Sequence, residues 1–293
     1  MVPIAIPANL AANAAGSDEP DLRDWVAGLP RVVAETAARW ALRLGEPFQP
    51  GGGCSWVAPA RDHAGRDLVL KVGWRHPEAL HEADGLALWA GDGAVRLYAA
   101  HTFAETTVLL IERCRPGTTL SRVVAEPEQD AVVAGLLRRL WREPPPGHSF
   151  RALQVMCDQW AAGFQRRLSA TPGSVDAGLA RAGLALWRAL PASAGSSVVL
   201  CTDLHAENIL AAQREPWLVC DPKPYVGDPA YDALQHMLNC TERLVADPAG
   251  FARRMAELLD LDTDRLTRWL FARCVMDAPE NAELREVAAR LAP

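Results

Sequence analysis

Three oxygen-bearing side chains, Asp203, Asn208 and Asp221, lie within a short stretch of the second half of the sequence. Asp203 ends one apolar segment and Asn208 begins the next, while Asp221 ends a further segment that can pair with residues 209–211 as a strand. Phosphoryl transfer needs such a set, because one carboxylate accepts the proton of the attacking hydroxyl and hard oxygen atoms bind Mg²⁺. Taken singly, each residue is better explained as a turn residue or a cap, but their joint spacing favours a catalytic role.

A lysine inside an apolar strand is the second candidate. Lys71 stands in the segment LVLKV, where a lone charge is costly unless it is paired. Glu78 and Glu82 lie one turn apart on the helix expected next, and we favour Glu82 as the partner. A lysine held in this way can bind the α- and β-phosphates of a nucleotide. The simpler alternative is a strand-edge lysine that reaches solvent.

A glycine cluster, Gly51, Gly52 and Gly53, precedes the first strand of the hairpin that contains Lys71. Glycine allows backbone amides to approach phosphate oxygens closely, so these three residues are candidates for nucleotide binding. The cluster matches neither of the common phosphate-binding glycine motifs. Taken alone, such a cluster is more often a flexible turn.

Overall charge and cysteine usage exclude several classes of protein. The 293 residues include 30 basic and 36 acidic ones, a net charge of -6, so no basic excess is available for nucleic acid. A mildly acidic surface instead suits a cationic small-molecule partner. The seven cysteines show no CxxC spacing, which argues against a zinc site or a disulfide framework and favours a reducing, cytoplasmic compartment. No apolar run is long enough to suggest a membrane span, and nothing in the pattern predicts the oligomeric state.

Periodicity places the candidate residues in a strand-rich first part and a helix-rich second part. We expect helices over 21–44, 76–90, 131–141, 151–168 and 176–190, and strands over 55–60, 66–72, 95–99, 106–111, 198–201, 208–211 and 217–220. This segregation indicates an α+β fold with two lobes. The expected first lobe, 1–113, contains a small antiparallel sheet, and the second, 114–293, is larger and mainly helical.

Three segments resemble one known family. LCTDLHAENIL at 200–210 resembles the catalytic loop of the aminoglycoside phosphotransferases, which have a protein-kinase-like fold. DPKPYVGDPAYD at 221–232 and LKVGWRHPEALHEADGLALW at 70–89 are similar to the streptomycin 6-kinase and hydroxyurea phosphotransferase branch. The likeness extends from Asp21 to the C-terminal helices, and the Asp203 and Asp221 motifs are specific when taken together.

The resemblance implies a role for each candidate residue and implies ATP and Mg²⁺ as cofactors. It makes Asp203 the catalytic base, Asn208 and Asp221 the magnesium ligands, and Lys71 a phosphate-binding lysine paired with Glu82. It also implies that the backbone of a hinge at Glu112, Arg113 and Cys114 binds adenine. The implied fold has a five-stranded sheet in the small lobe.

One departure from the family pattern concerns the residues before the proposed base. The family usually has His-Gly-Asp where this chain has Cys201-Thr202-Asp203. Cysteine is a poor hydrogen-bond partner and threonine lacks the backbone freedom of glycine, so the loop geometry is in question. We interpret His205 as a loop-packing residue rather than a catalytic one. We expect Asp228 to brace the catalytic loop and Asp232 to begin a helix.

The leading functional hypothesis is transfer of the ATP γ-phosphate to a hydroxyl of an aminoglycoside-type antibiotic, with streptomycin as the first choice. Three acidic residues are candidates for contact with a cationic acceptor on charge alone, and solvated surface explains them equally well: Glu242, Asp277 and Glu280. One alternative is a kinase for hydroxyurea or a metabolic alcohol. Another, from a different class, is an inactive kinase fold that acts as a binding module, which only the Cys201-Thr202 departure supports.

Overall fold

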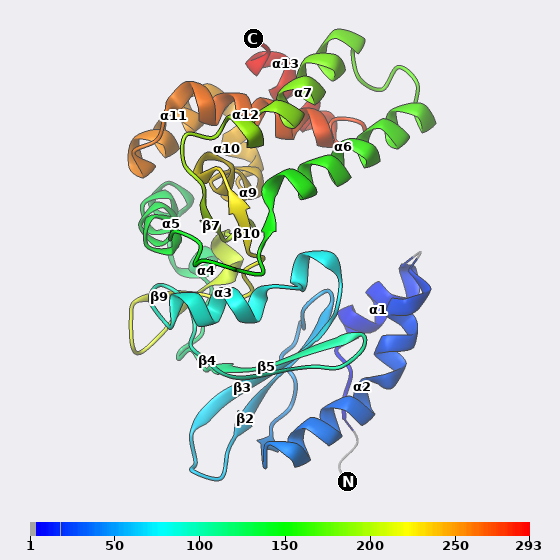
Figure 1. Ribbon diagram of the computed structural model, residues 1–293, viewed down its shortest axis with the longest axis vertical. Helices are drawn as coiled ribbons and strands as arrows, with labels where there is room; N and C mark the ends of the chain where they lie inside the picture. The colour runs from blue at the N-terminus through cyan, green and yellow to red at the C-terminus, as the bar shows by residue number, and fades with distance from the viewer. Residues whose placement is uncertain (1–3, 18) are drawn as a thin grey trace. The chain divides into compact units, whose positions relative to one another are not determined.

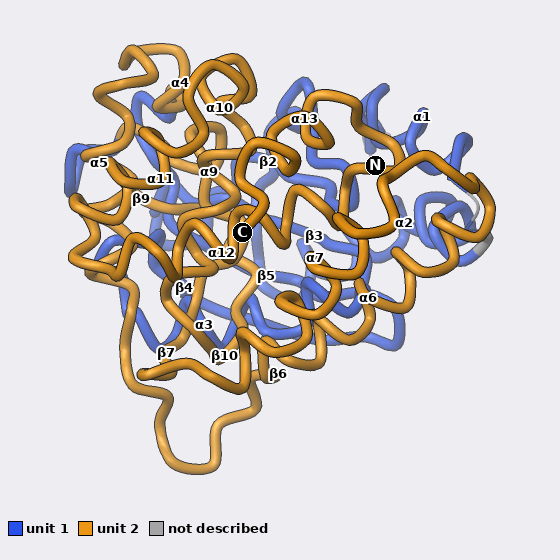
Figure 2. Tube along the Cα trace, turned by 90° about the horizontal axis from the view of Figure 1, so that it is seen from above, with its two compact units in different colours: residues 1–117, 212–216 blue, residues 118–211, 217–293 orange. Residues whose placement is uncertain are grey.

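A computed structural model describes residues 4–17 and 19–293, and the chain forms two compact units (Figures 1 and 2). The first unit consists of Met1–Gly117 together with Ala212–Pro216, and the second of Thr118–Ala211 with Trp217–Pro293. The division after Gly117 lies close to the boundary expected after residue 113. The return of 212–216 to the first unit was not anticipated.

A five-stranded antiparallel sheet forms the centre of the first unit, in the order β1-β2-β3-β5-β4. Its strands are β1 (Arg43–Leu44), β2 (Ser55–Arg61), β3 (Asp67–Trp74), β4 (Leu97–Thr102) and β5 (Thr106–Glu112). Strand β3 lies between β2 and β5, with Lys71 opposite Val57 on one side and Leu109 on the other. The lysine therefore occupies the middle of the sheet, and not an edge.

Helices α1 (Ala8–Gly16) and α2 (Pro20–Arg39) pack against the sheet in one apolar core (Figure 1). Alternate residues of β3, namely Leu68, Leu70 and Val72, contribute to this core together with Leu29 of α2. Because side chains alternate along a strand, Lys71 points to the other face of the sheet. There the short turn η1 (Pro77–Ala79) and helix α3 (Glu82–Trp89) follow β3 in the chain.

The first long helix is shorter than its periodicity predicts. It ends at Arg39, because Ala41 has a φ of +50° and the Leu42 amide donates to the Ala37 carbonyl at 2.8 Å. Residues 43–44, expected to be helical, form β1 and pair with the end of β2. A two-residue strand is too short to leave a periodic signal in the sequence.

The second unit is mainly helical and contains two small sheets. Strands β6 (Arg151–Ala152), β10 (Tyr225–Gly227) and β7 (Val198–Leu200) form one sheet, and β8 (Ile209–Ala211) with β9 (Trp217–Val219) form the other. Its helices are α4 (Leu120–Val123), α5 (Glu126–Leu140), α6 (Leu153–Ala170), α7 (Ala177–Ala189), α8 (Pro229–Asp232), α9 (Leu234–Asn239), α10 (Thr241–Ala246), α11 (Pro248–Leu259), α12 (Thr263–Asp277) and α13 (Ala282–Leu291), with 3-10 turns η2 (Pro191–Ser193) and η3 (Ala206–Asn208).

A buried carboxylate connects four of these helices. Asp130 of α5 is completely buried, and His236 Nε2 of α9 lies 2.8 Å from its Oδ1. Arg243 of α10 donates to both of its oxygens, and Arg254 of α11 donates to Oδ2 at 2.7 Å. Burial alone would raise the pKa of Asp130, but these three partners hold the pKa well below its usual value.

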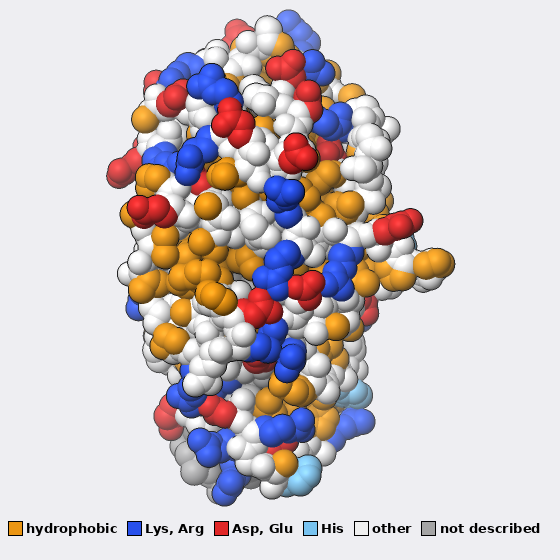
Figure 3. All heavy atoms as spheres, turned by 90° about the vertical axis from the view of Figure 1, so that its left-hand side faces the viewer, with side chains coloured by type: hydrophobic (Ala, Val, Ile, Leu, Met, Phe, Trp, Pro, Cys, Tyr) orange, Lys and Arg blue, Asp and Glu red, His pale blue; other side chains and the backbone are white. Residues whose placement is uncertain are grey.

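The surface carries charges of both signs, which are interspersed on the face seen in Figure 3. Apolar side chains lie between them on the same face. Within the described part of the chain, no helix is both long and apolar enough to cross a bilayer.

Candidate active site

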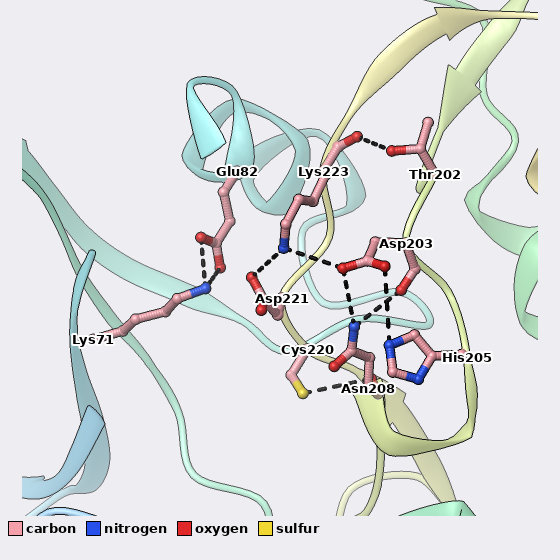
Figure 4. Close-up of polar contacts among 9 residues, drawn as sticks. All are labelled: Lys71, Glu82, Thr202, Asp203, His205, Asn208, Cys220, Asp221 and Lys223. Carbon is pink, nitrogen blue, oxygen red and sulfur yellow. Dashed lines mark hydrogen bonds and ion pairs between the residues drawn. The ribbon is translucent and has the colours of Figure 1, made fainter. Parts of the chain in front are cut away.

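Lys71 and Glu82 form a buried ion pair in the first unit (Figure 4). The Lys71 ammonium donates to Glu82 Oε1 at 2.6 Å and to Oε2 at 2.7 Å, and both residues are more than 90% buried. Glu82 is the first residue of α3, where a carboxylate also benefits from the positive end of the helix dipole. The pair fixes a positive charge on the face of β3 that the apolar core does not occupy.

The choice between two glutamates depends on a break in the helix expected at 76–90. The structure replaces its first turn with η1, and Glu78 is exposed there. Helix α3 begins only at Glu82, so the two glutamates do not lie one turn apart on the same helix. Glu82 is therefore the acidic partner that the structure assigns to Lys71.

Side chains of helix α1 form hydrogen bonds with the backbone of the Gly51–Gly53 cluster. The Gly51 amide donates to Asn9 Oδ1 at 2.8 Å, and Asn9 Nδ2 donates back to the Gly51 carbonyl at 2.6 Å. A Cβ atom at Gly51 would lie 2.8 Å from the ring of Pro7. The close approach of Pro7 thus explains why position 51 is glycine. The Gly51 amide already donates to Asn9, so it is not available to a phosphate.

The expected hinge residues engage their side chains in ion pairs within the first unit. Glu112, the last residue of β5, accepts from Arg214 Nε and Nη2 at 3.0 and 2.9 Å, and Arg214 Nη2 also donates to the Ala94 carbonyl. Burial alone would raise the pKa of Glu112, but hydrogen bonds, above all those from Arg214, hold it below its usual value. Arg113 donates to Asp67 at 2.8 Å. These side chains are thus occupied by the protein itself.

Cys114 follows these residues and is half-buried. Burial raises the pKa of its thiol to about 12. The thiol is therefore neutral at physiological pH, which makes it a packing group and not a reactive one. A role for this segment in adenine binding rests on its backbone alone.

In the second unit, Asp203 and Asn208 lie on one loop, residues 201–208, between β7 and β8 (Figure 4). The Asn208 amide nitrogen donates to the Asp203 carbonyl at 3.0 Å and lies 3.5 Å from its carboxylate. The Asp203 side chain is 28% exposed. The loop is thus closed by its own polar groups, and the carboxylate remains accessible.

The β8–β9 hairpin brings Asp221 to the same end as Asn208. Ile209 pairs with Val219, which confirms the expected strand pairing, and the Cys220 amide donates to the Asn208 carbonyl at 2.9 Å. Asp221 comes next, with a φ of +56° and a side chain that is 41% exposed. The structure therefore brings together all three residues of the set Asp203, Asn208 and Asp221.

Lys223 is the functional candidate that the sequence analysis missed. Its ammonium lies 3.1 Å from Asp221 Oδ1 and 3.2 Å from Asp203 Oδ2 (Figure 4). A compositional signal was present, because only Lys71 and Lys223 are lysine among the 30 basic residues of the chain.

The carboxylate that braces the 201–208 loop is Asp232, so the expectation for Asp228 was wrong. Asp232 is fully buried and accepts from the amides of Cys201 at 2.9 Å and Thr202 at 2.6 Å, and from Trp141 Nε1 at 3.0 Å. Burial raises the pKa of Asp232 to about 6, and these three donors oppose that rise. Asp228 instead caps α8 at Ala230.

Arg265 and Trp269 of α12 both donate to Asp228, at 2.6 and 2.5 Å. The carboxylate of Asp228 thus joins α8 to α12. Two carboxylates four positions apart, in the same GDPAYD segment, therefore have different tasks.

Thr202 shows how the loop accommodates the Cys201-Thr202 departure. Its φ is +53°, the left-handed region that favours glycine. Its hydroxyl donates to the Lys223 carbonyl at 2.5 Å, and the Lys223 amide donates to the Cys201 carbonyl at 2.9 Å. Threonine thus adopts the backbone conformation that glycine would adopt with less strain, and it adds a hydrogen bond that glycine lacks.

His205 and the three acidic candidates for the acceptor have ordinary surroundings. His205 Nε2 lies 3.9 Å from Asp203 Oδ1, too far for a hydrogen bond, and burial lowers the pKa of this histidine although Asp203 opposes the effect. Among the three acidic candidates for the acceptor, Asp277 accepts a hydrogen bond from Arg273, Glu280 lies 3.7 Å from Arg167, and Glu242 is exposed on α10.

The donor atoms at the end of the β8–β9 hairpin suit Mg²⁺. The Asn208 amide nitrogen is directed to Asp203, so a metal ion would meet the amide oxygen, and Asp221 would add a carboxylate. Phosphate-transferring enzymes usually bind Mg²⁺ through one or two such groups together with substrate phosphates. Within residues 4–17 and 19–293, no cluster of three or more His, Cys, Asp or Glu could hold an ion. Asn208 and Asp221 are two oxygen-bearing side chains of the kind that Mg²⁺ binds beside substrate phosphates.

Comparison with known proteins adds sequence evidence. Residues 39–284 match the model of a family described as aminoglycoside/hydroxyurea antibiotic resistance kinase. The chain is 34% identical over 283 residues to the streptomycin 6-kinase of Streptomyces griseus, an alignment that covers 94% of this chain and 90% of that protein. It is 33% identical over 269 residues to the hydroxyurea phosphotransferase of Kitasatospora aureofaciens, covering 91% and 77%.

Solved structures identify the fold. The crystal structure of a choline kinase from Streptococcus pneumoniae matches with a TM-score of 0.59, over 90% of this chain and 97% of that chain, at 11% identity. At so low an identity the likeness shows the fold alone. The expected α+β, protein-kinase-like fold is confirmed.

Proposed function

The chain belongs to the aminoglycoside/hydroxyurea antibiotic resistance kinase family, and on that premise we propose that its acceptor is streptomycin or a closely similar cationic aminoglycoside. It is an ATP-dependent phosphotransferase that acts on a hydroxyl group of a small molecule. The observation that carries the choice of acceptor is the 34% identity to a streptomycin 6-kinase across 94% of the chain.

In this proposal the second unit contributes the chemistry. Asp203 orients the acceptor hydroxyl and takes its proton, for which its accessible carboxylate is suited. Asn208 and Asp221 hold Mg²⁺, which on binding would offset negative charge on the phosphates. Asp232 fixes the backbone of Cys201 and Thr202, so Asp203 begins the reaction from a fixed position.

The first unit contributes nucleotide binding. Lys71 supplies a positive charge for the phosphates and is kept in place by Glu82. The backbone of Glu112, Arg113 and Cys114 binds adenine. Gly51, Gly52 and Gly53 act as a loop near the phosphates, with Gly52 and Gly53 better suited than Gly51, whose amide is already bonded to Asn9.

The test is turnover with ATP, Mg²⁺ and a panel of acceptors, followed by mass spectrometry of the products. We expect streptomycin to gain one phosphoryl group, and we expect Asp203→Ala to abolish this while ATP-analogue binding is retained. Exposed Glu286→Gln is the matched control and should leave turnover unchanged. An active Asp203→Ala protein would exclude Asp203 as the base, and absence of turnover with any aminoglycoside would contradict the proposed acceptor.

Hydroxyurea is the second candidate acceptor, because the chain is also 33% identical to a hydroxyurea phosphotransferase. The pairing of Asp277 with Arg273 favours it, because that pairing engages one of the acidic side chains suggested for a cationic acceptor. A thermal-shift screen with Mg²⁺ and a non-hydrolysable ATP analogue separates the two, since the true acceptor raises the melting temperature by mass action.

A further inference from the structure

Lysine is almost absent from this chain, and both of its lysines lie at candidate site residues. Lys71 binds Glu82, and Lys223 lies against Asp203 and Asp221; every other residue of the 30 basic ones is arginine. Arginine is a planar, forked donor, whereas lysine is a compact point charge on a flexible stem. A compact charge is the better choice where a cation must approach a group that changes its geometry during a reaction.

The position of the Lys223 ammonium is well defined by its surroundings. It lies 3.1 Å from Asp221 Oδ1 and 3.2 Å from Asp203 Oδ2, and its side chain is only 17% exposed. The Lys223 backbone is bonded to Cys201 and Thr202, and Pro222 and Pro224 restrict the chain on either side. The backbone of Lys223 is therefore restrained, whereas its methylene chain can still change conformation and move the ammonium.

In the proposed reaction, the γ-phosphoryl group of ATP moves between the carboxylates of Asp221 and Asp203. Asp221 would hold the metal ion that binds the ATP phosphates, and Asp203 would accept the proton of the acceptor hydroxyl. The phosphoryl group must therefore pass from the nucleotide near Asp221 to the acceptor near Asp203. In the transition state, negative charge spreads over the three equatorial oxygens of this group. A cation within reach of both carboxylates is close to that path.

We propose that Lys223 is a catalytic residue whose ammonium contacts the transferred phosphoryl group. In the step, the acceptor oxygen bonds to the γ-phosphorus, the bond from that phosphorus to the β,γ-bridging oxygen breaks, the hydroxyl proton passes to Asp203, and ADP leaves. Lys223 stabilises the charge on the equatorial oxygens and keeps its own protons throughout. The inference rests on the proposed function. Lys223 is not among the residues to which the family resemblance assigns a role, so it adds a second cation to the site.

A purely structural role for Lys223 predicts different behaviour. If the ammonium only held Asp203 and Asp221 together, its loss would weaken the ground-state nucleotide complex and the transition-state complex equally. A catalytic ammonium is needed mainly in the transition state, so its loss should lower kcat and leave ground-state binding nearly unchanged.

The first experiment compares Lys223→Met and Lys223→Arg with wild type. We expect Lys223→Met to lower kcat by about 10²–10³-fold, the usual effect of removing one group that stabilises transition-state charge, with KM changes of only a few-fold. Lys223→Arg should recover part of that loss. Arg268→Met, at an exposed position of α12, is the matched control and should behave as wild type. Circular dichroism and the melting temperature show whether each variant is folded.

The second experiment measures binding without turnover. We expect Lys223→Met to bind Mg·ADP as wild type does, and to lose affinity for Mg·ADP with aluminium fluoride and acceptor by about the factor lost in kcat. Equal losses for both complexes would indicate the structural role and overturn the proposal.

The third experiment uses the wild-type protein and so does not depend on a variant's activity. Labelling the lysine side chains with ¹³C at Cε gives only two lysine signals, which Lys223→Arg assigns. We expect the Lys223 signal to shift between Mg·ADP and the complex with aluminium fluoride and acceptor. An unchanged Lys223 signal, or unchanged kcat in Lys223→Met, would overturn this inference alone, whereas absence of wild-type turnover would contradict the proposed function.

Discussion

The Thr202 hydroxyl donates to the main-chain carbonyl of Lys223 at 2.5 Å, from a backbone with a φ of +53°. A left-handed conformation costs a non-glycine residue about 1–2 kcal/mol, and one hydrogen bond contributes about 1 kcal/mol. Thr202→Gly removes both effects, so its free energy of unfolding should stay within about 1 kcal/mol of wild type. Thr202→Val keeps the strain and loses the bond, so it should lose about 1–3 kcal/mol. Urea denaturation measures both, with Thr202→Ser as the control that keeps the hydroxyl.

Replacing Glu82 should impair both stability and nucleotide binding. Glu82→Gln leaves the Lys71 ammonium buried without its counter-charge, and removal of one partner of a buried pair costs about 3–5 kcal/mol. We also expect the KM for ATP to rise, because Lys71 is no longer held in place. Chemical denaturation and the ATP dependence of turnover measure the two effects. The matched variant Glu78→Gln changes an exposed residue and should alter neither; equal effects of the two variants would contradict the assigned pair.

Adding a methyl group to the glycine cluster should have different consequences at adjacent positions. At Gly51 the new Cβ would lie 2.8 Å from the ring of Pro7, which cannot rotate away, so Gly51→Ala should destabilise the protein by about 1–3 kcal/mol. At Gly52 the nearest atom is the Ser55 hydroxyl oxygen, which can rotate, and the nearest backbone atom, the Ser55 carbonyl oxygen, lies at 3.2 Å, so Gly52→Ala should be milder. The melting temperature and limited proteolysis of the N-terminal segment measure the difference. A larger effect at Gly52 would contradict the close contact between Gly51 and Pro7.

The Asp130 cluster should make stability depend on pH in acid. The pKa of this carboxyl lies below its ordinary value of 3.8 in the folded protein, so its contribution is present above that pH and is lost as the pH falls below it. Asp130→Asn should therefore cost about 3–5 kcal/mol at neutral pH, and the difference from wild type should shrink below pH of about 4. Denaturation curves at several pH values test this, with exposed Glu286→Gln as the control. A difference that does not vary with pH would show that the cluster acts through packing alone.

Long elements with a clear period were predictable, and so were the short strands β7, β8 and β9, which lie in apolar runs beside the catalytic motifs. Other short strands were not. The β2–β3 hairpin and helices α5, α6 and α7 follow directly from the alternation and spacing of apolar residues. Strands β1, β6 and β10 contain two or three residues and exist because of their partners in the sheet, so no local signal identifies them. Their formation depends on contacts between distant parts of the chain.

The candidate site was predictable as a set of residues, but not as a set of contacts. Motif spacing identified Asp203, Asn208 and Asp221, whereas the ion pairs of Lys223 depend on how the loop and the hairpin fold together. The roles of Asp228 and Asp232 were exchanged because two identical side chains in one short segment cannot be distinguished by chemistry. The two aspartates differ in how deeply their side chains are buried and in which partners these side chains contact.

The bond between Arg214 and Glu112 joins residues 102 positions apart and lies within the first unit. During synthesis on the ribosome, the strands of this unit emerge long before Arg214 does. Until then, Glu112 and the Ala94 carbonyl lack the guanidinium that binds them in the finished molecule. The first unit therefore cannot complete its native contacts cotranslationally from its own leading segment, and its final stabilisation is delayed until much of the second unit has been made.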